Sequence, residues 1–142
     1  MTLEKVELSF MTQKTNNYLK QKLENFERSV DALETSVAKP VEEPRDLSGI
    51  IKDFEISFEL CWKTLKIYLE TAGHTTGTAR DIFKKAFSLN LVDNEEDILK
   101  MIEDRNLTVH TYDSEFATAM VQRIRDIYLN IFREIAKRVK KP

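Results

Sequence analysis

The stretch Lys14–Ala38, KTNNYLKQKLENFERSVDALETSVA, decides the fold class of this chain. Its large apolar side chains recur every three or four positions, so they lie along one face of a helix: Leu19, Leu23, Phe26, Val30, Leu33 and Val37. Pro40 and Pro44 follow, and we expect the helix to end before a linker over 39–45. Residues 1–13 form a possible extension, and their apolar spacing suits either a helix or a strand.

A second helix is predicted to begin near Asp46 or Ser48, since either side chain can accept from free backbone N–H groups. Gly73 is placed to end it, because glycine takes a left-handed conformation at little cost. Its large apolar and aromatic side chains share one face, which we expect to form the centre of the core: Ile50, Ile51, Phe54, Phe58, Cys61, Trp62, Leu65, Tyr68 and Leu69.

Three further helix starts are marked by polar capping residues: Thr78 with Asp81, the run 93–96, and Asp113 with its neighbours. The helix after residue 96 is expected to extend its apolar set to Val109. The expected inner face of the last helix is Phe116, Met120, Ile124, Ile127, Ile131 and Ile135. Five helices with short links predict an all-α fold, an antiparallel up-and-down helical bundle of four to five helices. We expect a single domain over 1–142, with its core at about 14–140.

Composition excludes several other classes of protein. Three Gly and three Pro among 142 residues are too few for the turns of a small all-β fold or for a glycine-rich nucleotide loop. A formal net charge of −2 lacks the positive field of a protein that coats nucleic acid. One Cys and two His cannot form a four-ligand zinc site of nitrogen and sulfur, and Cys61 is expected to be a buried, inert thiol.

The sequence also bears on location. It has no signal-peptide pattern and no uncharged apolar run near the roughly 18 residues of a membrane span. We therefore expect a cytoplasmic protein with no membrane association, no bound metal and no cofactor of its own.

One segment, Arg105–Tyr112, departs from the good helix formers around it. The plain interpretation is a frayed helix end before Asp113. The functional interpretation rests on spacing, because Asn106 and His110 are four residues apart and would share one helix face. Arg105 has a side chain long enough to reach the imidazole or a second copy of the site, and Tyr112 follows the expected helix end.

These groups suit metal-independent cleavage of RNA. His110 is a candidate general base for a 2′-hydroxyl, and Arg105 a candidate to stabilise charge on the phosphoryl oxygens. The Asn106 amide is placed to fix the imidazole tautomer. An Arg–His pair at this spacing is a weak signal alone, because such spacings occur by chance in many helices. The other histidine, His74, is expected to lie in a solvated loop.

Three motifs in order carry a more specific resemblance. The segment Arg105-Asn106-x-x-x-His110-x-Tyr112 resembles the HEPN superfamily motif, in the variant with a tyrosine two residues after the histidine. The runs 51–66 (IKDFEISFELCWKTLK) and 80–87 (RDIFKKAF) are similar to segments of the nucleotidyltransferase substrate-binding protein family. The resemblance spans about Leu19 to Ile135, nearly the whole chain.

The resemblance implies a helical subunit that forms a homodimer and pairs with a separately encoded minimal nucleotidyltransferase. In related pairs the helical protein is a ribonuclease toxin, and its partner is an antitoxin that can transfer AMP to the motif tyrosine. On this basis Arg105 and His110 would be catalytic, Asn106 supporting, and Tyr112 the modification target, with RNA as substrate.

Two alternatives stay open. The helical subunit can instead be a non-catalytic substrate-binding or regulatory subunit of the nucleotidyltransferase, or a purely structural adaptor in which Arg105 and His110 pair within the bundle. Positive charge near the motif is limited to Arg105, Lys100 and Arg80, so the sequence does not reveal an RNA-binding surface.

Overall fold

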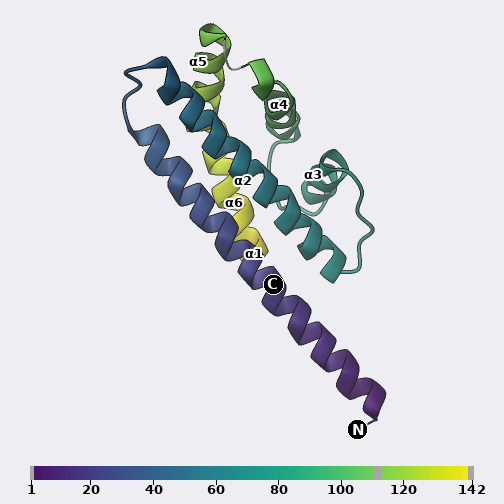
Figure 1. Ribbon diagram of the computed structural model, residues 1–142. Coiled ribbons are helices and arrows are strands. Elements are labelled where there is room, and N and C mark those ends of the chain that lie inside the picture. The colour runs from purple at the N-terminus through teal and green to yellow at the C-terminus, as the bar shows by residue number, and fades with distance from the viewer. Residues whose placement is uncertain (1, 111–112, 141–142) are drawn as a thin grey trace.

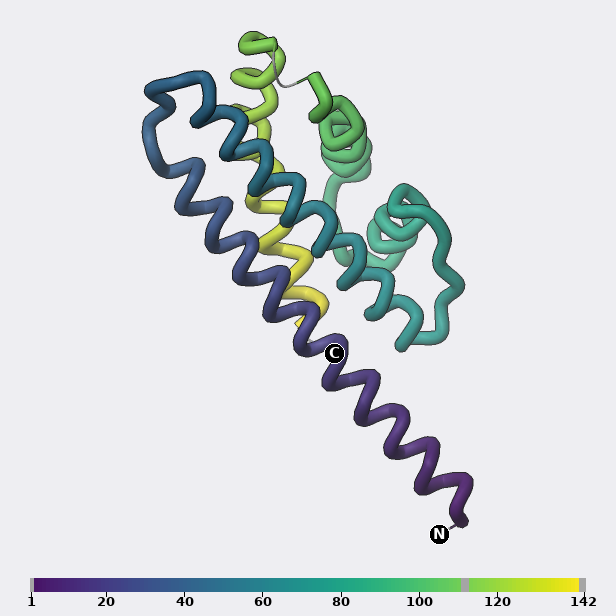
Figure 2. Tube along the Cα trace, viewed as in Figure 1, coloured from purple at the N-terminus to yellow at the C-terminus, as the bar shows by residue number. Residues whose placement is uncertain are grey.

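The structure of the chain, a computed structural model, describes residues 2–110 and 113–140. Among these residues there are helices and no strands. Three long helical segments run side by side (Figure 1). The first is antiparallel to the other two, which run in the same direction, and two short helices lie between the second and the third along the chain. The Cα trace shows the same up-and-down path (Figure 2). The predicted all-α antiparallel bundle is confirmed.

The helices follow one another with short connections. The first half contains α1 (Leu3–Ala38), α2 (Pro44–Thr71) and α3 (Ala79–Ser88). The second half contains α4 (Glu95–Asn106), the 3-10 turn η1 (Thr108–His110), α5 (Ser114–Arg123), the π-helical segment η2 (Ile124–Tyr128) and α6 (Leu129–Lys140). The segments α5, η2 and α6 form one unbroken helix, which packs against both α1 and α2.

The first helix is longer than its apolar stripe predicted. It begins at Leu3, where the Thr2 side chain accepts from the N–H of Lys5, so the ambiguous first residues are helical and not a strand. The predicted stripe is buried from Leu23 onward, whereas every described residue from Thr2 to Tyr18 is exposed. The helix therefore continues well beyond the part that the bundle covers.

The second helix begins before the predicted cap. Its N-cap is Glu43, and the prediction of Asp46 or Ser48 is wrong. Asp46 instead lies in the first turn, where its carboxylate accepts from the backbone N–H groups of Glu42 and Glu43, each at 2.9 Å. These bonds hold the pKa of Asp46 below its ordinary value. Pro44 starts the helix because it needs no N–H partner there, so this proline is an initiator and not part of the linker.

The other predicted helix starts and the predicted end of α2 are confirmed. Asn94 and Asp113 cap α4 and α5 through their side chains. Gly73 follows α2 with φ of 88°, in the left-handed region that the helix stop requires. At α3, Thr78 accepts from the N–H of Asp81 at 3.2 Å, and the Asp81 carboxylate accepts from the N–H of Thr78 at 3.1 Å. This reciprocal pair is the predicted capping box.

We predict that Thr78→Ala lowers the free energy of unfolding by about 1 kcal/mol, because it leaves the Asp81 N–H without its acceptor. Urea denaturation measures this change. Thr35→Ala is the matched control, since that exposed hydroxyl donates to a carbonyl within α1 and caps no helix. A Thr78→Ala protein as stable as the control would contradict the capping role.

The inner face of the last helix differs from the prediction. Met120, Ile124 and Ile135 are buried as expected, but Phe116, Ile127 and Ile131 are only partly buried, and the fully buried aromatic positions are Tyr128 and Phe132. For Ile127 and Ile131 the cause is η2, in which the N–H of Leu129 donates to the carbonyl of Ile124, five residues back. This wider turn shifts the later residues around the helix relative to an α-helical count.

The core lies between α1, α2 and the α5–α6 helix. Phe54 of α2 stacks on Tyr128 and Phe132, with ring centroids 5.5 and 6.0 Å apart, and Phe132 meets Phe26 of α1 edge-on at 5.8 Å. Cys61 is fully buried, which raises the pKa of its thiol and confirms the expected inert cysteine. In the described part of the chain, no helix combines the length and apolar character needed to span a membrane.

Candidate functional site

The segment predicted to carry chemistry lies where α4 ends. The helix ends at Asn106, and the N–H of Leu107 donates to the carbonyls of Glu103 and Asp104, both at 3.1 Å. The chain then turns into η1, which is closed by a bond of 2.9 Å from the N–H of His110 to the carbonyl of Leu107. The prediction that Asn106 and His110 share one helix face is therefore wrong, because no single helix contains both.

Thr108 accounts for part of this ending. Its hydroxyl donates to the carbonyl of Arg105 at 2.9 Å, and such local bonds compete with helical backbone pairing. Val109, predicted as part of the apolar set of α4, is 74% exposed because it belongs to η1 and not to the helix. The plain interpretation of a helix end before Asp113 is thus correct for the backbone.

Arg105 is held by two neighbours. Its Nη1 donates to the Thr108 hydroxyl at 3.3 Å, and its Nη2 lies 3.6 Å from Oε1 of Glu59 on α2. Within the described residues, its Nε is buried and has no hydrogen-bond partner. The guanidinium is therefore oriented by its neighbours, and among the described residues it is incompletely satisfied.

Glu59 was missed by the sequence reasoning, although it lies within the run 51–66 that carried the resemblance. Its carboxylate accepts from Nε1 of Trp62 at 3.2 Å and lies 3.9 Å from Nζ of Lys63. With Arg105 it joins α2 to the end of α4. The position of Glu59 in the sequence did not predict its contact with Arg105, because that contact depends on where the end of α4 lies relative to α2.

Of the other motif residues, the structure describes Asn106 and His110 but not Tyr112. Asn106 and His110 are exposed. Tyr112, the predicted modification target, lies outside the described residues. The structure therefore brings Arg105 together with Glu59 and Thr108, and it presents His110 on the adjacent turn.

A second group missed by the sequence reasoning supports this end of α4 from inside. Asp104 is fully buried, and its carboxylate takes two hydrogen bonds from Arg123, at 2.6 and 2.9 Å. The hydroxyl of Tyr128 also donates to it. The sequence did indicate that Asp104 is buried, because it follows Met101 by three residues and Ile98 by six and therefore lies on the apolar face of α4. An acid at such a position predicts a buried partner.

Asp104, Arg123 and Tyr128 form a trio in which burial and neighbouring charges shift the pKa values of Arg123 and Tyr128. The hydrogen bond from Arg123 to Asp104 raises the pKa of the guanidinium, so it stays charged. Burial, and then the Asp104 carboxylate, raise the pKa of Tyr128 far above its ordinary value of 10. Tyr128 is therefore a donor at every physiological pH. Its contribution to stability is fully present below about 10, the pKa of an unfolded tyrosine, declines as the pH rises above 10, and is lost above the raised pKa of the folded state.

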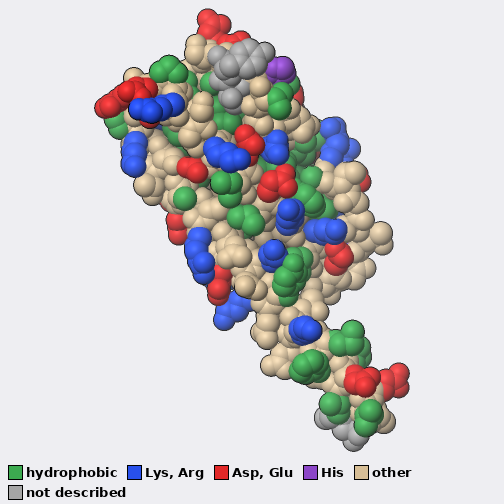
Figure 3. Space-filling model, viewed as in Figure 1, with side chains coloured by type: hydrophobic (Ala, Val, Ile, Leu, Met, Phe, Trp, Pro, Cys, Tyr) green, Lys and Arg blue, Asp and Glu red, His purple; other side chains and the backbone are tan. Residues whose placement is uncertain are grey.

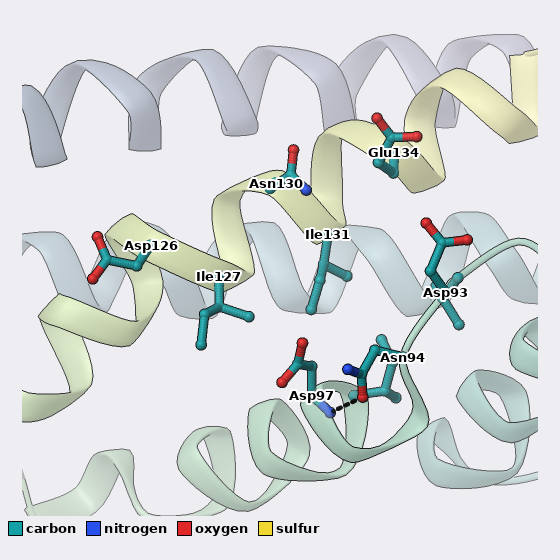
Figure 4. Close-up of a pocket in the computed structure, with 10 residues that line it drawn as sticks. Asp93, Asn94, Asp97, Asp126, Ile127, Asn130, Ile131 and Glu134 are labelled. Atoms are coloured by element: carbon teal, nitrogen blue, oxygen red, sulfur yellow. Dashed lines mark hydrogen bonds between the residues drawn. The ribbon is translucent and has the colours of Figure 1, made fainter.

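A hollow of about 210 Å³ lies on another side of α4, toward the last helix (Figure 4). Ile127 and Ile131 point into it, and carboxylates of Asp93, Asp97 and Asp126 lie around them. Asp93 is paired with Arg138 at 2.8 Å, which lowers the pKa of that carboxyl group. In the described ranges no group of three or more His, Cys, Asp or Glu is arranged to hold a metal ion. The hollow shares no lining residue with the Arg105 cluster.

Comparison with protein families gives one match over most of the chain. The family described as nucleotidyltransferase substrate binding protein like matches residues 21–141. The protein named Probable ribonuclease HepT from Haemophilus influenzae is 30% identical over 88 residues. That match covers 58% of this chain and 60% of the relative, so it spans less than two thirds of the relative's length.

Two solved structures share the fold. A crystal structure of a protein from Thermus thermophilus superposes with a TM-score of 0.75 at 28% identity, over 82% of this chain and 99% of that one. A Haemophilus influenzae structure gives a TM-score of 0.65 at 24% identity, over 88% of this chain and 98% of that one. The latter is described as revealing the fold of a substrate binding domain of a nucleotidyltransferase.

Proposed function

The chain belongs to the nucleotidyltransferase substrate-binding-protein-like family, and from this premise we propose that it is the helical subunit of a pair with a minimal nucleotidyltransferase. The partner supplies the nucleotide-binding loop and the metal-binding carboxylates of nucleotidyl transfer. The helical subunit acts as a metal-independent endoribonuclease that the partner restrains. Both proteins work in the cytoplasm as a toxin–antitoxin module.

The observation that carries this proposal is the arrangement of Arg105. Its guanidinium is oriented by Glu59 and Thr108, next to the turn that exposes His110. An oriented cation beside an imidazole is what cleavage of a phosphodiester at a 2′-hydroxyl requires. The name of the Haemophilus influenzae relative, Probable ribonuclease HepT, supports the same reaction.

In the proposed reaction His110 removes the proton of a ribose 2′-hydroxyl. The 2′-oxygen forms a bond to the adjacent phosphorus, and the bond from phosphorus to the 5′-oxygen breaks. The 5′-oxygen takes up a proton and leaves as a hydroxyl, while the phosphate remains as a 2′,3′-cyclic ester. Arg105 stabilises the negative charge on the phosphoryl oxygens, and Asn106 supports the imidazole.

Two further parts of the proposal concern control. Tyr112 is the residue to which the partner transfers AMP, and the added phosphate places negative charge two residues from His110. Two copies of the chain form a homodimer that brings two Arg105 groups to one RNA-binding cleft. The cleft thus gathers two guanidinium groups, although each copy of the chain carries a net charge of −2.

The test is expression in a bacterial host with and without the partner. We expect the chain alone to arrest growth and the partner to relieve the arrest, because the partner blocks or modifies the ribonuclease. The two proteins should co-purify through a tag on either one. After incubation with partner and ATP, a peptide containing Tyr112 should gain the mass of at least one AMP. Normal growth without the partner, together with intact RNA, would contradict the ribonuclease.

A second candidate is a non-catalytic subunit that binds substrate for the nucleotidyltransferase. The family description and the description of the Haemophilus influenzae structure favour it. It predicts the same stable complex with the partner, but no RNA cleavage by either protein alone. Growth arrest in the absence of the partner therefore separates the two candidates.

A further inference from the structure

The carboxylate of Glu59 gathers three side chains from α2 and the end of α4. Its Oε2 accepts from the indole Nε1 of Trp62 at 3.2 Å and lies 3.9 Å from Nζ of Lys63. Its Oε1 lies 3.6 Å from Nη2 of Arg105. The indole and the guanidinium therefore contact the same carboxylate group. An aromatic ring is thus held next to the proposed catalytic arginine, and the reaction proposed above makes no use of it.

Trp62, the one tryptophan of the sequence, has a fixed orientation. It is partly buried and packs against the hydrophobic core, and its N–H donates to Glu59. The ammonium of Lys63 lies 5.7 Å from the ring centroid, in a cation–π contact. Because the Lys63 side chain is 52% exposed, the part of the ring beneath its ammonium lies at the surface. The indole is therefore an oriented ring with one side toward solvent.

Positive charge accompanies this ring along α2. Lys63 and Lys66 are both exposed and lie three residues apart, so they share one helix face. Lys and Arg side chains lie across this side of the molecule, among acidic and hydrophobic ones (Figure 3). The contact of Lys63 with Glu59 is long and solvent-exposed, and such pairs contribute little to stability. Lys63 can therefore turn from the ring toward a phosphate at small cost.

We propose that Trp62 and Lys63 form a nucleotide-binding subsite beside Arg105, in which the indole stacks on an unpaired base of the RNA substrate. Lys63 leaves the ring and contacts a backbone phosphate, and the base takes its place over the indole. This inference rests on the proposed ribonuclease function, in which Arg105 contacts the scissile phosphate. A nucleotide joins its base to its phosphate through one sugar, so a phosphate at Arg105 brings a neighbouring base to the indole.

Stacking on an aromatic side chain defines the class of RNA. Bases inside a double helix are stacked on one another, whereas unpaired bases in loops and at ends are able to stack on protein side chains. Every base has an aromatic face, so such a ring tolerates many sequences. The subsite therefore selects single-stranded RNA and restricts its sequence little. It also supplies affinity that does not depend on a broad positive surface, which suits a chain with a net charge of −2.

The first test uses the fluorescence of Trp62. Because the full chain has one tryptophan, its tryptophan fluorescence reports on this site alone. The probe is a short single-stranded RNA whose 2′-hydroxyls are methylated, so that it binds but cannot be cleaved. We expect it to quench the fluorescence, and a strand with the same backbone but no bases to bind more weakly and without quenching. Equal quenching by the strand without bases, or no quenching by the intact probe, would overturn the proposal.

Two substitutions test the ring and the lysine separately, with the anisotropy of a dye-labelled probe as the measurement. Trp62→Leu should raise the dissociation constant about 10-fold, and Trp62→Phe, which keeps a ring, should raise it less. Lys63→Ala should reduce the slope of log affinity against log salt concentration by about 0.7, the amount expected for one lost phosphate contact to a single strand. Lys63 is exposed, so this variant should keep its helical circular dichroism even if Trp62→Leu does not. An unchanged salt slope would overturn the role of Lys63.

Tyr18 and Lys22 provide the matched control. The Lys22 ammonium lies 5.4 Å from the centroid of the exposed Tyr18 ring, so this pair repeats the arrangement of a lysine over an aromatic ring. It belongs to α1, which contacts α2 through Ser57 and Thr64, on another side of α2 than Glu59. Tyr18→Leu and Lys22→Ala should therefore keep the dissociation constant and the salt slope of the unchanged chain.

The outcomes separate this subsite from the proposed function. Quenching by the methylated probe, without cleavage of ordinary RNA, would support the subsite and contradict the ribonuclease. Cleavage of RNA at unchanged kcat/KM by both Trp62→Leu and Lys63→Ala would overturn the subsite and leave the ribonuclease standing. Weaker binding of the nucleotidyltransferase by these variants, with RNA binding unchanged, would also overturn the subsite and would assign this surface to the partner.

Discussion

Asp104→Ala is expected to lower the free energy of unfolding by about 3 kcal/mol, one of the two largest effects that the structure predicts. The substitution removes the acceptor of Arg123 and of the Tyr128 hydroxyl in a fully buried position. Breaking a buried ion pair from one side typically costs about 3–5 kcal/mol, because the remaining charge stays unpaired. The lower end applies here, since the Arg123 side chain is 26% exposed and can turn toward water.

Urea denaturation measures this loss, provided that the free energy of unfolding falls with urea concentration at the same slope in the variant and in the unchanged chain. Asp126→Ala is the matched control, because that carboxylate is exposed and accepts from Gln122 on the same surface, and its removal should change stability by less than about 0.5 kcal/mol. Tyr128→Phe removes a second member of the trio, and the double variant should lose less than the sum of the two single losses. A loss below about 1 kcal/mol for Asp104→Ala would show that the network does not stabilise this end of α4.

His110→Ala is expected to lower the rate of RNA cleavage by about 10²–10⁴-fold, since the substitution removes the proposed general base. Arg105→Ala should cause a loss of similar size, because the phosphoryl charge then lacks its cation. Cleavage of a labelled RNA by the purified protein, with EDTA present, measures both variants. The His110 side chain is exposed, so its variant should unfold at the same urea concentration as the unchanged chain.

His74→Ala serves as the matched control, as it removes the other histidine from the loop between α2 and α3, away from the Arg105 cluster. It should cleave RNA at the unchanged rate. If His110→Ala and Arg105→Ala both remain fully active and fully toxic on expression, the ribonuclease assignment at these residues is wrong. The pairing with a nucleotidyltransferase would survive that outcome.

Local signals predicted most of the helix boundaries. Thr78, Asn94 and Asp113 each cap the helix that they were expected to cap, because capping depends on a side chain and a backbone group three residues or fewer apart. The start of α2 was misplaced because Glu43 is an unusual N-cap, whose role depends on Asp46 in the first turn.

The candidate site was less predictable, because its geometry depends on packing between distant elements. Nothing in the spacing of Arg105 and His110 showed that the helix ends between them at Asn106. The contact of Arg105 with Glu59 joins residues that are far apart in the sequence, and it forms only because the end of α4 lies next to α2. Asp104 was the exception, since an acid in an apolar stripe was visible in the sequence.

The π-helical segment η2 also fixes the rotation, about the helix axis, of the residues in α6 relative to those in α5. One residue corresponds to about 100° around an α-helix. Upstream of η2, Arg123 faces Asp104, and downstream Phe132 faces the aromatic core. A deletion of one residue between 124 and 128 would restore α-helical winding but misalign one of these two contacts. Insertions and deletions in descendants of this chain should therefore avoid this turn and collect instead in the loops between helices.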